Sequence, residues 1–183
     1  MSDSFHLRQA ATLIRAGGVV AYPTEAVYGL GCDPLNYPAV LRLLAIKQRP
    51  EDKGLILLAS DAEQLRPWVN LDEDGWQKMR ASWPGPVTFL VPPSPLVPNW
   101  ITGRFEQVAV RVSGHPLARD LARLAGTPIV STSANLTGRP SAKNRFQVGR
   151  QLGDEVDFIV TGQCNLADRP SSIVDLETGK VIR

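Results

Sequence analysis

The sequence predicts an α/β fold, because short apolar segments of strand length alternate with amphipathic helical segments along most of the chain. The last apolar segments, 172–175 and 181–183, flank the turn sequence 177–180 and are expected to form a hairpin. Antiparallel strands at the end of an otherwise alternating chain predict a mixed sheet. Ligands of such sheets bind beyond the ends of strands, so the loops that follow strands are the candidate site.

The first helix is predicted where apolar residues recur on one helical face, at Leu7, Ala10, Ala11 and Ile14. The glycine pair at 17–18 ends this helix, and residues 19–22 form an apolar strand. Residues 23–32 are rich in small and hydroxyl side chains and are predicted to be a loop. Within it, Gly29 and Gly31 allow positive φ or close approach of the backbone to a ligand.

A second helix is expected to begin at Asn36 or Tyr37, with Pro38 near its first position, and to end at about Lys47. Its core-facing side chains are predicted to be Val40, Leu41 and Leu44. A basic loop and a buried strand at 55–59 follow.

Helical segments and a proline-rich loop fill the middle of the chain. Ser60 and Glu63 have the spacing of a capping box, which opens a short helix. Residues 72–82 form another helix, with Trp76 and Met79 in the core, and residues 87–91 form a strand. The segment 92–102 contains four prolines and is predicted to be a stiff surface loop.

In the second half, strands at 108–112, 129–132 and 158–160 alternate with helices at 116–125 and 144–152. Arg111 is the single cation within the first of these strands. A lone buried arginine is costly unless it is paired. We therefore expect Arg111 either to bind an anion such as a carboxylate or to form a structural salt bridge.

At 183 residues the chain is expected to be a single domain spanning 1–183. Its net charge of +2 implies no partner, but residues 104–150 hold eight basic and two acidic residues. That excess either attracts an anionic ligand or RNA or forms a solvated basic face. Cys32 and Cys164 lack metal-ligand spacing and predict buried or incidental thiols in a reducing compartment. No apolar run reaches the ~18 residues of a membrane span. The N-terminus lacks the pattern of a signal peptide, so we expect a cytoplasmic protein without membrane contact.

Three cations, Lys47, Arg49 and Lys53, lie on the connection between the second helix and the strand at 55–59. Pro50 fixes the backbone next to Arg49. A guanidinium fork and a mobile ammonium can together hold the phosphates of a nucleotide. The alternative is a solvated helix end whose cations complement the helix dipole.

Four hydrogen-bonding side chains occupy the five positions from Ser131 to Asn135, at a strand end. They can bind ribose, phosphate or a small polar substrate, or simply form a polar turn. The two histidines, His6 and His115, have no evident acidic partner, and the P-loop pattern is missing, so a hydrolase triad and a P-loop are not supported. Cations and hydroxyls without an acid–base pair suit nucleotidyl transfer, which needs positioning, charge neutralisation and a divalent metal.

Five segments carry a family resemblance, and they occur in this order: Tyr22-Pro-Thr-Glu-Ala-Val-Tyr-Gly-Leu-Gly31, Lys47-Gln-Arg-Pro50, Trp83-Pro-Gly-Pro-Val-Thr88, Val108-Ala-Val-Arg-Val112 and Ser131-Thr-Ser-Ala-Asn-Leu-Thr-Gly138. With them the sequence resembles the YrdC/Sua5 family, in its short bacterial form, over nearly the whole chain. The Lys-x-Arg and Ser-x-Asn triplets are specific as a pair.

The resemblance implies a single YrdC-like catalytic domain, an open twisted mixed sheet with helices around a large positively charged cavity, and no C-terminal Sua5 domain. It implies a nucleotidyltransferase that makes threonylcarbamoyl-adenylate and pyrophosphate from L-threonine, bicarbonate and ATP, with Mg²⁺. It also implies a partner complex that transfers the threonylcarbamoyl group to adenosine 37 of tRNA, and affinity for tRNA or double-stranded RNA.

By the resemblance, the residues that contact threonine are Thr24, Arg111, Ser131 and Ser171. The catalytic residues around ATP are Lys47, Arg49, Ser133 and Asn135. Further contacts to the nucleotide come from Lys53, Ser141 and Arg183. No residue is assigned as a metal ligand.

The sequence departs from the family pattern at three places. Lys53 lies where longer members often have Asn, and Leu58 lies at about the position of a His near threonine. The Glu that often precedes the serine at 171 is absent. Two alternative functions remain: an RNA-binding or rRNA-maturation module without ATP turnover, and a carbamoyl-transfer module of the kind found in hydrogenase-maturation proteins.

Overall fold

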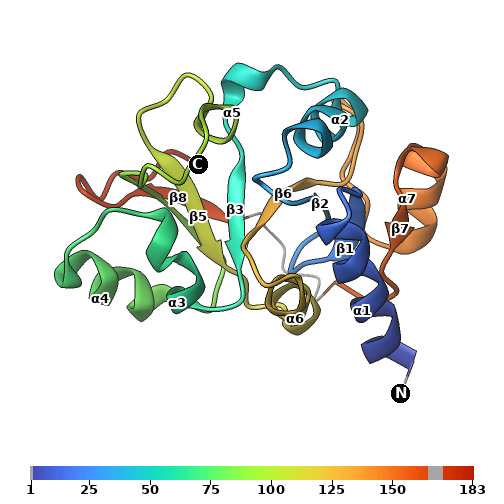
Figure 1. Ribbon diagram of the computed structural model, residues 1–183, viewed down its shortest axis with the longest axis horizontal. Coiled ribbons are helices and arrows are strands. Elements are labelled where there is room, and N and C mark those ends of the chain that lie inside the picture. The colour runs from blue at the N-terminus through green and yellow to red at the C-terminus, as the bar shows by residue number, and fades with distance from the viewer. Residues whose placement is uncertain (1, 165–170) are drawn as a thin grey trace.

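The computed structural model describes residues 2–164 and 171–183, and its strands form one mixed eight-stranded sheet in the order β7-β1-β2-β6-β3-β5-β4-β8 (Figure 1). The described strands are β1 Val20–Pro23, β2 Tyr28–Gly31, β3 Ile56–Ala59, β4 Val87–Val91, β5 Val108–Val112, β6 Ile129–Ser133, β7 Phe158–Ile159 and β8 Ser172–Asp175. The described α-helices are α1 Ser2–Arg15, α2 Tyr37–Lys47, α3 Ala62–Leu65, α4 Glu73–Ser82, α5 Asn99–Thr102, α6 Pro116–Ala125 and α7 Arg145–Leu152.

The sheet combines parallel and antiparallel pairs, as the sequence predicts. β3 pairs with β5 in parallel, while β6 joins β2 and β3 through antiparallel ladders. The predicted hairpin at the end of the chain is present, because Val174 and Val181 form an antiparallel bridge. None of the helices in the described part of the chain is both long and apolar enough to cross a membrane.

Helices cover the two faces of the sheet unequally. On one face, Tyr22 of β1, Leu58 of β3 and Ile129 of β6 pack under α1 and α6, which lie side by side (Figure 1). Because side chains alternate along a strand, their neighbours face the other way. Ala21 and Leu57 join the larger core cluster, with side chains from α2, α4, α5 and α7.

The strand β2 is the main departure from the predicted elements, since 23–32 was expected to be a loop. Tyr28 and Leu30 are fully buried, and β2 pairs with β1 and β6. Gly29 and Gly31 lie against the ring of Tyr22, where a Cβ atom at either position would meet ring carbons at 3.2 and 2.9 Å. The glycines that suggested a loop therefore make room for a tyrosine in the neighbouring strand.

Smaller corrections concern the helices. Leu43, not Leu41, faces the core from α2, and Leu41 is 36% exposed. Asp61, not Ser60, caps α3 by accepting a hydrogen bond from the N–H of Gln64. The proline-rich segment contains the short helix α5, whose Ile101 is fully buried.

Other expectations are confirmed. Asn36 caps α2 through its side chain, with a proline in the first turn. Trp76 and Met79 lie in the core. Cys32 and Cys164 are free and buried.

The contact between Gly31 and its neighbours yields a prediction about stability. A Cβ at this position would lie 2.6 Å from the carbonyl oxygen of Val130, which is backbone and cannot move aside cheaply. We expect Gly31→Ala to lower the free energy of unfolding by about 1–3 kcal/mol, as overpacking does. Urea denaturation measures the change.

Gly149 supplies the matched control. It lies within α7, and a Cβ there would meet nothing within 4 Å. Gly149→Ala should leave stability unchanged or raise it by about 0.5–1 kcal/mol, because glycine is unfavourable inside a helix. Equal stability of Gly31→Ala and the unmodified protein would contradict the packing described for β2.

Candidate functional site

A cavity of about 490 Å³ opens on the part of the sheet that α1 and α6 leave uncovered. Ile56 of β3 and Ala109 and Arg111 of β5 line it, and each alternates with core residues of the opposite face. This alternation gives β5 a buried–half-buried pattern along its whole length. The volume lies in the range of small-molecule and cofactor sites.

Nine of the eleven site residues predicted from the sequence line this one cavity: Thr24, Arg49, Lys53, Arg111, Ser131, Ser133, Ser141, Ser171 and Arg183. They come from loops and strands far apart in the chain. Lys47 and Asn135 do not line the cavity and lie behind its wall.

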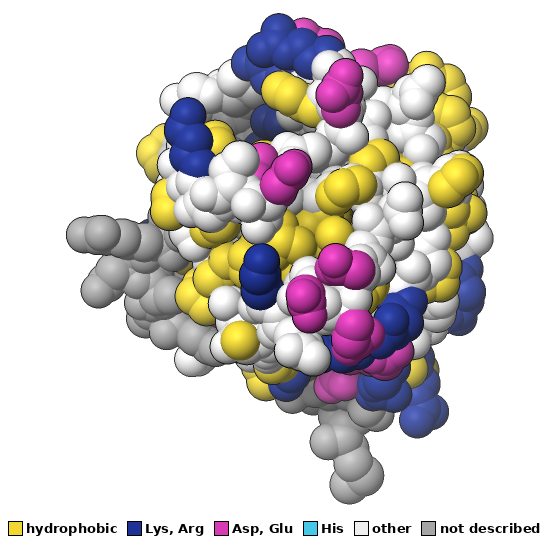
Figure 2. Space-filling view, turned by 90° about the vertical axis from the view of Figure 1, so that its left-hand side faces the viewer, with side chains coloured by type: hydrophobic (Ala, Val, Ile, Leu, Met, Phe, Trp, Pro, Cys, Tyr) yellow, Lys and Arg dark blue, Asp and Glu magenta, His cyan; other side chains and the backbone are white. Residues whose placement is uncertain are grey.

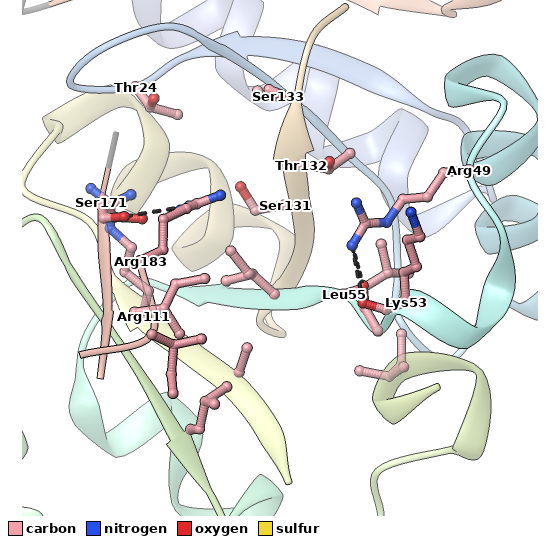
Figure 3. A pocket seen from close by; sticks show the side chains of 18 of the residues that line it. Thr24, Arg49, Lys53, Leu55, Arg111, Ser131, Thr132, Ser133, Ser171 and Arg183 are labelled. Atoms are coloured by element: carbon pink, nitrogen blue, oxygen red, sulfur yellow. Dashed lines mark hydrogen bonds between the residues drawn. The ribbon is translucent and has the colours of Figure 1, made fainter. Parts of the chain in front are cut away.

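The charged residues of the cavity lie in two groups. Figure 3 shows Arg49 and Lys53 on one side and Arg111, Ser171 and Arg183 on the other, with Ser131 between them. The charged side chains of the described lining are the four cations Arg49, Lys53, Arg111 and Arg183 and one carboxylate, that of Glu25. A cavity with this balance attracts anions.

Lys47 is a buried cation that links the end of α2 to the end of β6. Its ammonium donates to the carbonyl oxygen of Ser133 at 2.6 Å, and to the carbonyl and side-chain oxygens of Asn135 at 2.8 and 2.7 Å. Burial and the nearby charge of Arg49 lower the pKa of Lys47 to about 8, so it remains mostly protonated at neutral pH. Three oxygen acceptors satisfy a charge that is otherwise costly to bury.

Arg49 lies where helix α2 ends. Gln48 adopts the left-handed conformation with φ 50°, and Pro50 keeps Arg49 out of the helical region. One Nη of Arg49 donates to the carbonyl oxygens of Lys53 and Gly54, which fixes the basic loop (Figure 3). Burial, and then the positive charge of Arg183, lower the pKa of Arg49. Two cations that repel each other across a cavity favour an anion between them.

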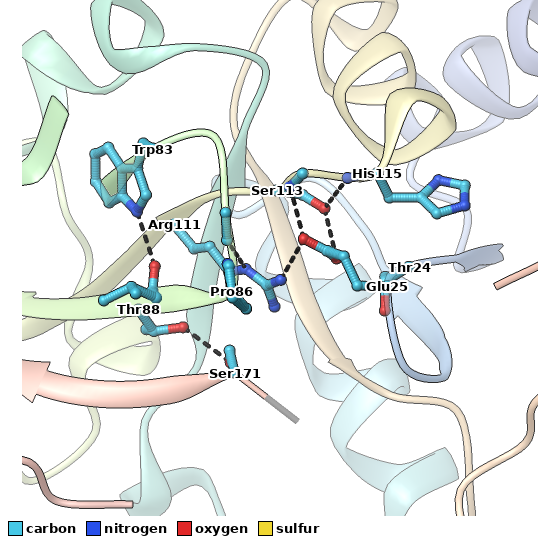
Figure 4. Close-up of polar contacts among 12 residues, drawn as sticks. Thr24, Glu25, Trp83, Pro86, Thr88, Arg111, Ser113, His115 and Ser171 are labelled. Atoms are coloured by element: carbon cyan, nitrogen blue, oxygen red, sulfur yellow. Dashed lines mark hydrogen bonds and ion pairs between the residues drawn. The ribbon is translucent and has the colours of Figure 1, made fainter. Parts of the chain in front are cut away.

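Arg111 is held by a carboxylate from the loop that follows β1. Its Nη2 donates to Glu25 Oε1 at 2.5 Å, and its Nε donates to the carbonyl oxygen of Gly85 at 3.1 Å (Figure 4). Both side chains of the ion pair are 11% exposed. The salt bridge predicted as one of two alternatives is therefore present, and Arg111 also lines the cavity.

Glu25 stays ionised because its environment favours the charged form. Burial raises the pKa of this carboxyl, but Arg111, the hydroxyl of Ser113 and the N–H of Gly114 outweigh burial and hold the pKa below its usual value. Thr24 of this loop is among the residues predicted from the sequence, and Glu25 is not. The signal was available, since a lone arginine in a strand needs a carboxylate partner.

Hydroxyl groups line the cavity between the cations. Ser131 accepts a hydrogen bond from Tyr22, and Ser171 accepts one from Thr88 (Figure 4). Thr24 donates to the carbonyl oxygen of Val27 at 2.6 Å. Tyr22 and Thr88 are fully buried behind the lining. They were not predicted as site residues, because the sequence does not show which buried hydroxyl lies next to which residue of the cavity.

Two further observations concern Leu58 and Mg²⁺. Leu58 is 1% exposed and packs in the core under α1 and α6, so it does not take the place of a polar contact to a ligand. No group of three or more His, Cys, Asp and Glu residues in the described ranges could hold a metal ion. The carboxylate of Glu25 is already bound by Arg111, so the described lining does not fit a metal held by protein ligands.

The Glu25–Arg111 pair yields a second prediction. Removing one partner of a buried ion pair leaves the other charge unpaired, which costs about 3–5 kcal/mol. Glu25→Gln should therefore strongly lower the free energy of unfolding measured with urea at pH 7. Glu63→Gln is the matched control, because the exposed Glu63 pairs with Arg66 and Arg80 at the surface. This substitution should lower the free energy of unfolding much less than Glu25→Gln does.

The same variant has a pH signature. The folded-state pKa of Glu25 lies below its unfolded value of 4.5, so its stabilising contribution is present above about pH 4.5 and is lost as the pH falls through the folded-state value. The unmodified protein should lose stability more steeply than Glu25→Gln on acidification below pH 4.5. If the free energy of unfolding falls equally steeply with pH in the two proteins, Glu25 is not ionised in the folded state.

A family model and many relatives match this chain. The Sua5/YciO/YrdC model, described as telomere recombination, matches residues 12–183. A protein named threonylcarbamoyl-AMP synthase from Cellvibrio japonicus is 50% identical over 175 residues, 95% of this chain and 93% of that protein. One of the same name from Pseudomonas aeruginosa is 50% identical over 184 residues, 100% of this chain and 99% of that protein.

Solved structures share the fold. P. abyssi Sua5 in complex with L-threonine has a TM-score of 0.86 and 37% identity, over 93% of this chain and 51% of that chain, so this chain spans about half of that Sua5 protein. E. coli YciO has a TM-score of 0.84 and 29% identity, over 97% of this chain and 87% of that chain. By sequence and by structure, the chain belongs to the Sua5/YciO/YrdC family.

Proposed function

We propose that this protein is a threonylcarbamoyl-AMP synthase, which makes threonylcarbamoyl-adenylate and pyrophosphate from L-threonine, bicarbonate and ATP. The observation that carries the proposal is one cavity that brings together nine of the eleven site residues predicted from the sequence, three of them cations and five of them hydroxyl side chains on the two sides of it, with Arg183 as a fourth cation. Relatives of almost equal length that are 50% identical bear this name. Threonine is the ligand of the related Sua5 complex.

The phosphates of ATP bind at the side of the cavity formed by Arg49 and Lys53. Arg49 is anchored by two carbonyl oxygens, so its guanidinium is positioned before the ligand arrives. Lys47 and Asn135 do not reach the cavity themselves. They hold Ser133, whose hydroxyl donates to Asn135 Oδ1 at 2.7 Å, and thereby shape the wall beside the phosphates. Ser141 extends the nucleotide contacts, and Arg183 faces the nucleotide from the opposite side of the cavity, where its charge also lowers the pKa of Arg49.

Threonine binds at the opposite side, among Thr24, Arg111, Ser131 and Ser171. Two Arg111 nitrogens are engaged by Glu25 and Gly85, which fixes the plane of the guanidinium. Its remaining edge faces an anionic group of the substrate, the α-carboxylate or the carbamate. The hydroxyls supply the hydrogen bonds that recognise a small polar amino acid.

The chemistry needs no covalent intermediate on the protein. The threonine amine attacks the carbon derived from bicarbonate, water leaves, and a carbamate forms. A carbamate oxygen then attacks the α-phosphorus of ATP, and the bond to the β-phosphate oxygen breaks to release pyrophosphate. Arg49 and Lys53 offset the charge that develops on the leaving group. Mg²⁺ enters with ATP as the substrate complex.

The product carries an activated threonylcarbamoyl group, which a partner complex transfers to adenosine 37 of tRNA. The domain of residues 1–183 supplies the activation step, and this role places the protein in the cytoplasm.

An RNA-binding module without ATP turnover is less well supported. The basic residues between 104 and 150 are spread over several elements, with Arg111 inside the cavity and Arg123 paired with Asp120. Figure 2 shows a different face, the left-hand side of Figure 1 with α4 and β8, and on it basic and acidic side chains are interspersed.

The proposal predicts a strict substrate requirement. Purified protein with MgATP and bicarbonate should release pyrophosphate with L-threonine and form an adenylate of the matching mass. With L-valine, in which a methyl group replaces the hydroxyl, the rate of pyrophosphate release should be at least about tenfold lower, because a buried hydrogen-bonding site is left unpaired. Pyrophosphate release that is independent of threonine or bicarbonate would refute the assignment.

Arg49 provides the sharpest variant. Arg49→Ala should lower kcat/KM for ATP about ten- to a hundredfold, the loss of one charge-assisted phosphate contact of about 1.5–3 kcal/mol. Arg123→Ala removes an exposed cation paired with Asp120 outside the cavity and should leave the rate unchanged. A normal rate of pyrophosphate release in Arg49→Ala would exclude its phosphate role.

A further inference from the structure

Two serines of the cavity are each held from behind by a buried hydroxyl. The phenol of Tyr22 lies 2.8 Å from Ser131 Oγ, and the hydroxyl of Thr88 lies 3.1 Å from Ser171 Oγ. Tyr22 and Thr88 are 0% exposed and do not line the cavity, whereas both serines do. Each pair therefore has one member that meets a ligand and one that never meets solvent.

The direction of the hydrogen bond between Tyr22 and Ser131 follows from burial. A buried O–H without an acceptor is costly, and Ser131 Oγ is the acceptor that the described residues offer to the phenol. Burial raises the pKa of Tyr22 far above its usual value, so the phenol keeps its proton and donates it. The ring cannot turn away, because it lies against Gly29 and Gly31.

Ser131 must then use its own proton elsewhere. A serine hydroxyl has one proton and two lone pairs, and the contact with Tyr22 occupies a lone pair. No hydrogen bond from Ser131 Oγ to another described residue exists, and the side chain borders the cavity. The proton of Ser131 is thus directed at whatever the cavity holds. The same reasoning applies to Ser171 in front of Thr88.

Thr24 has the opposite polarity. Its hydroxyl donates to the carbonyl oxygen of Val27, so it presents lone pairs to the cavity. The threonine side of the cavity therefore offers donors at Ser131, Ser171 and Arg111 and an acceptor at Thr24. An amino acid carries the complementary groups, a carboxylate or carbamate that accepts and an ammonium or hydroxyl that donates.

We propose that Tyr22 is a positioning residue that fixes Ser131 as a hydrogen-bond donor to an anionic oxygen of the amino-acid substrate, and that Thr88 does the same for Ser171. This inference rests on the proposed function and deepens it. Tyr22 and Thr88 touch no substrate and act through the serines.

A double-mutant cycle tests the inference, with pyrophosphate release as the assay. Tyr22→Phe keeps the ring and removes the hydroxyl, so we expect KM for threonine to rise about two- to tenfold, the worth of one hydrogen bond, while KM for ATP stays unchanged. In a Ser131→Ala background the same substitution should add no further change in KM, because its effect passes through Ser131. Thr88→Val and Ser171→Ala form a second, independent cycle.

The controls separate this inference from the function on which it rests. Tyr37→Phe removes a phenol outside the cavity lining and should leave both KM values unchanged. Urea denaturation and titration calorimetry of threonine without ATP separate a loss of fold from a loss of binding. If the unmodified protein uses threonine but the effects of Tyr22→Phe and Ser131→Ala are additive, or Tyr22→Phe leaves KM unchanged, the positioning role is wrong and the function stands. If the unmodified protein neither binds nor uses threonine, both proposals fail.

Discussion

Two buried cations determine how the loops of this protein meet. A charge taken out of water must find oxygen partners, and both Lys47 and Arg111 find them on segments distant in sequence. Lys47 ties the end of α2 to the turn after β6, and Arg111 ties β5 to the loop after β1. These two connections close the wall of the cavity before any ligand is present, so the site is largely preorganised by the needs of the fold itself.

The cavity exists because one face of the sheet is only partly covered. Helices α1 and α6 pack over β1, the start of β6 and Leu58 of β3, whereas Ala109 and Arg111 of β5, on the same face, are half-buried and line the cavity. Strand alternation then decides which residues meet a ligand. Val108 and Val110 belong to the core, while Ala109 and Arg111 face the cavity.

The two sides of the cavity combine recognition and chemistry in one hollow. Arg49 and Lys53 supply positive charge where a triphosphate can lie, and the opposite side supplies hydroxyls whose protons are set by buried partners (Figure 3). Holding an amino acid beside a nucleotide in this way brings a carbamate oxygen close to the α-phosphorus, so positioning and charge neutralisation replace a protein nucleophile.

The sequence by itself determined the α/β class, the mixed sheet, nearly every helix and strand, and the residues that carry charge or hydroxyls into the site, because periodicity and residue chemistry are local properties. It did not identify β2, since the glycines that suit a loop also suit a strand packed on a tyrosine ring. It could not show that Lys47 and Asn135 turn inward, or that Glu25 holds Arg111. These outcomes depend on which distant segments share a low-dielectric interior, and only the tertiary structure decides where a buried charge or hydroxyl finds its partner.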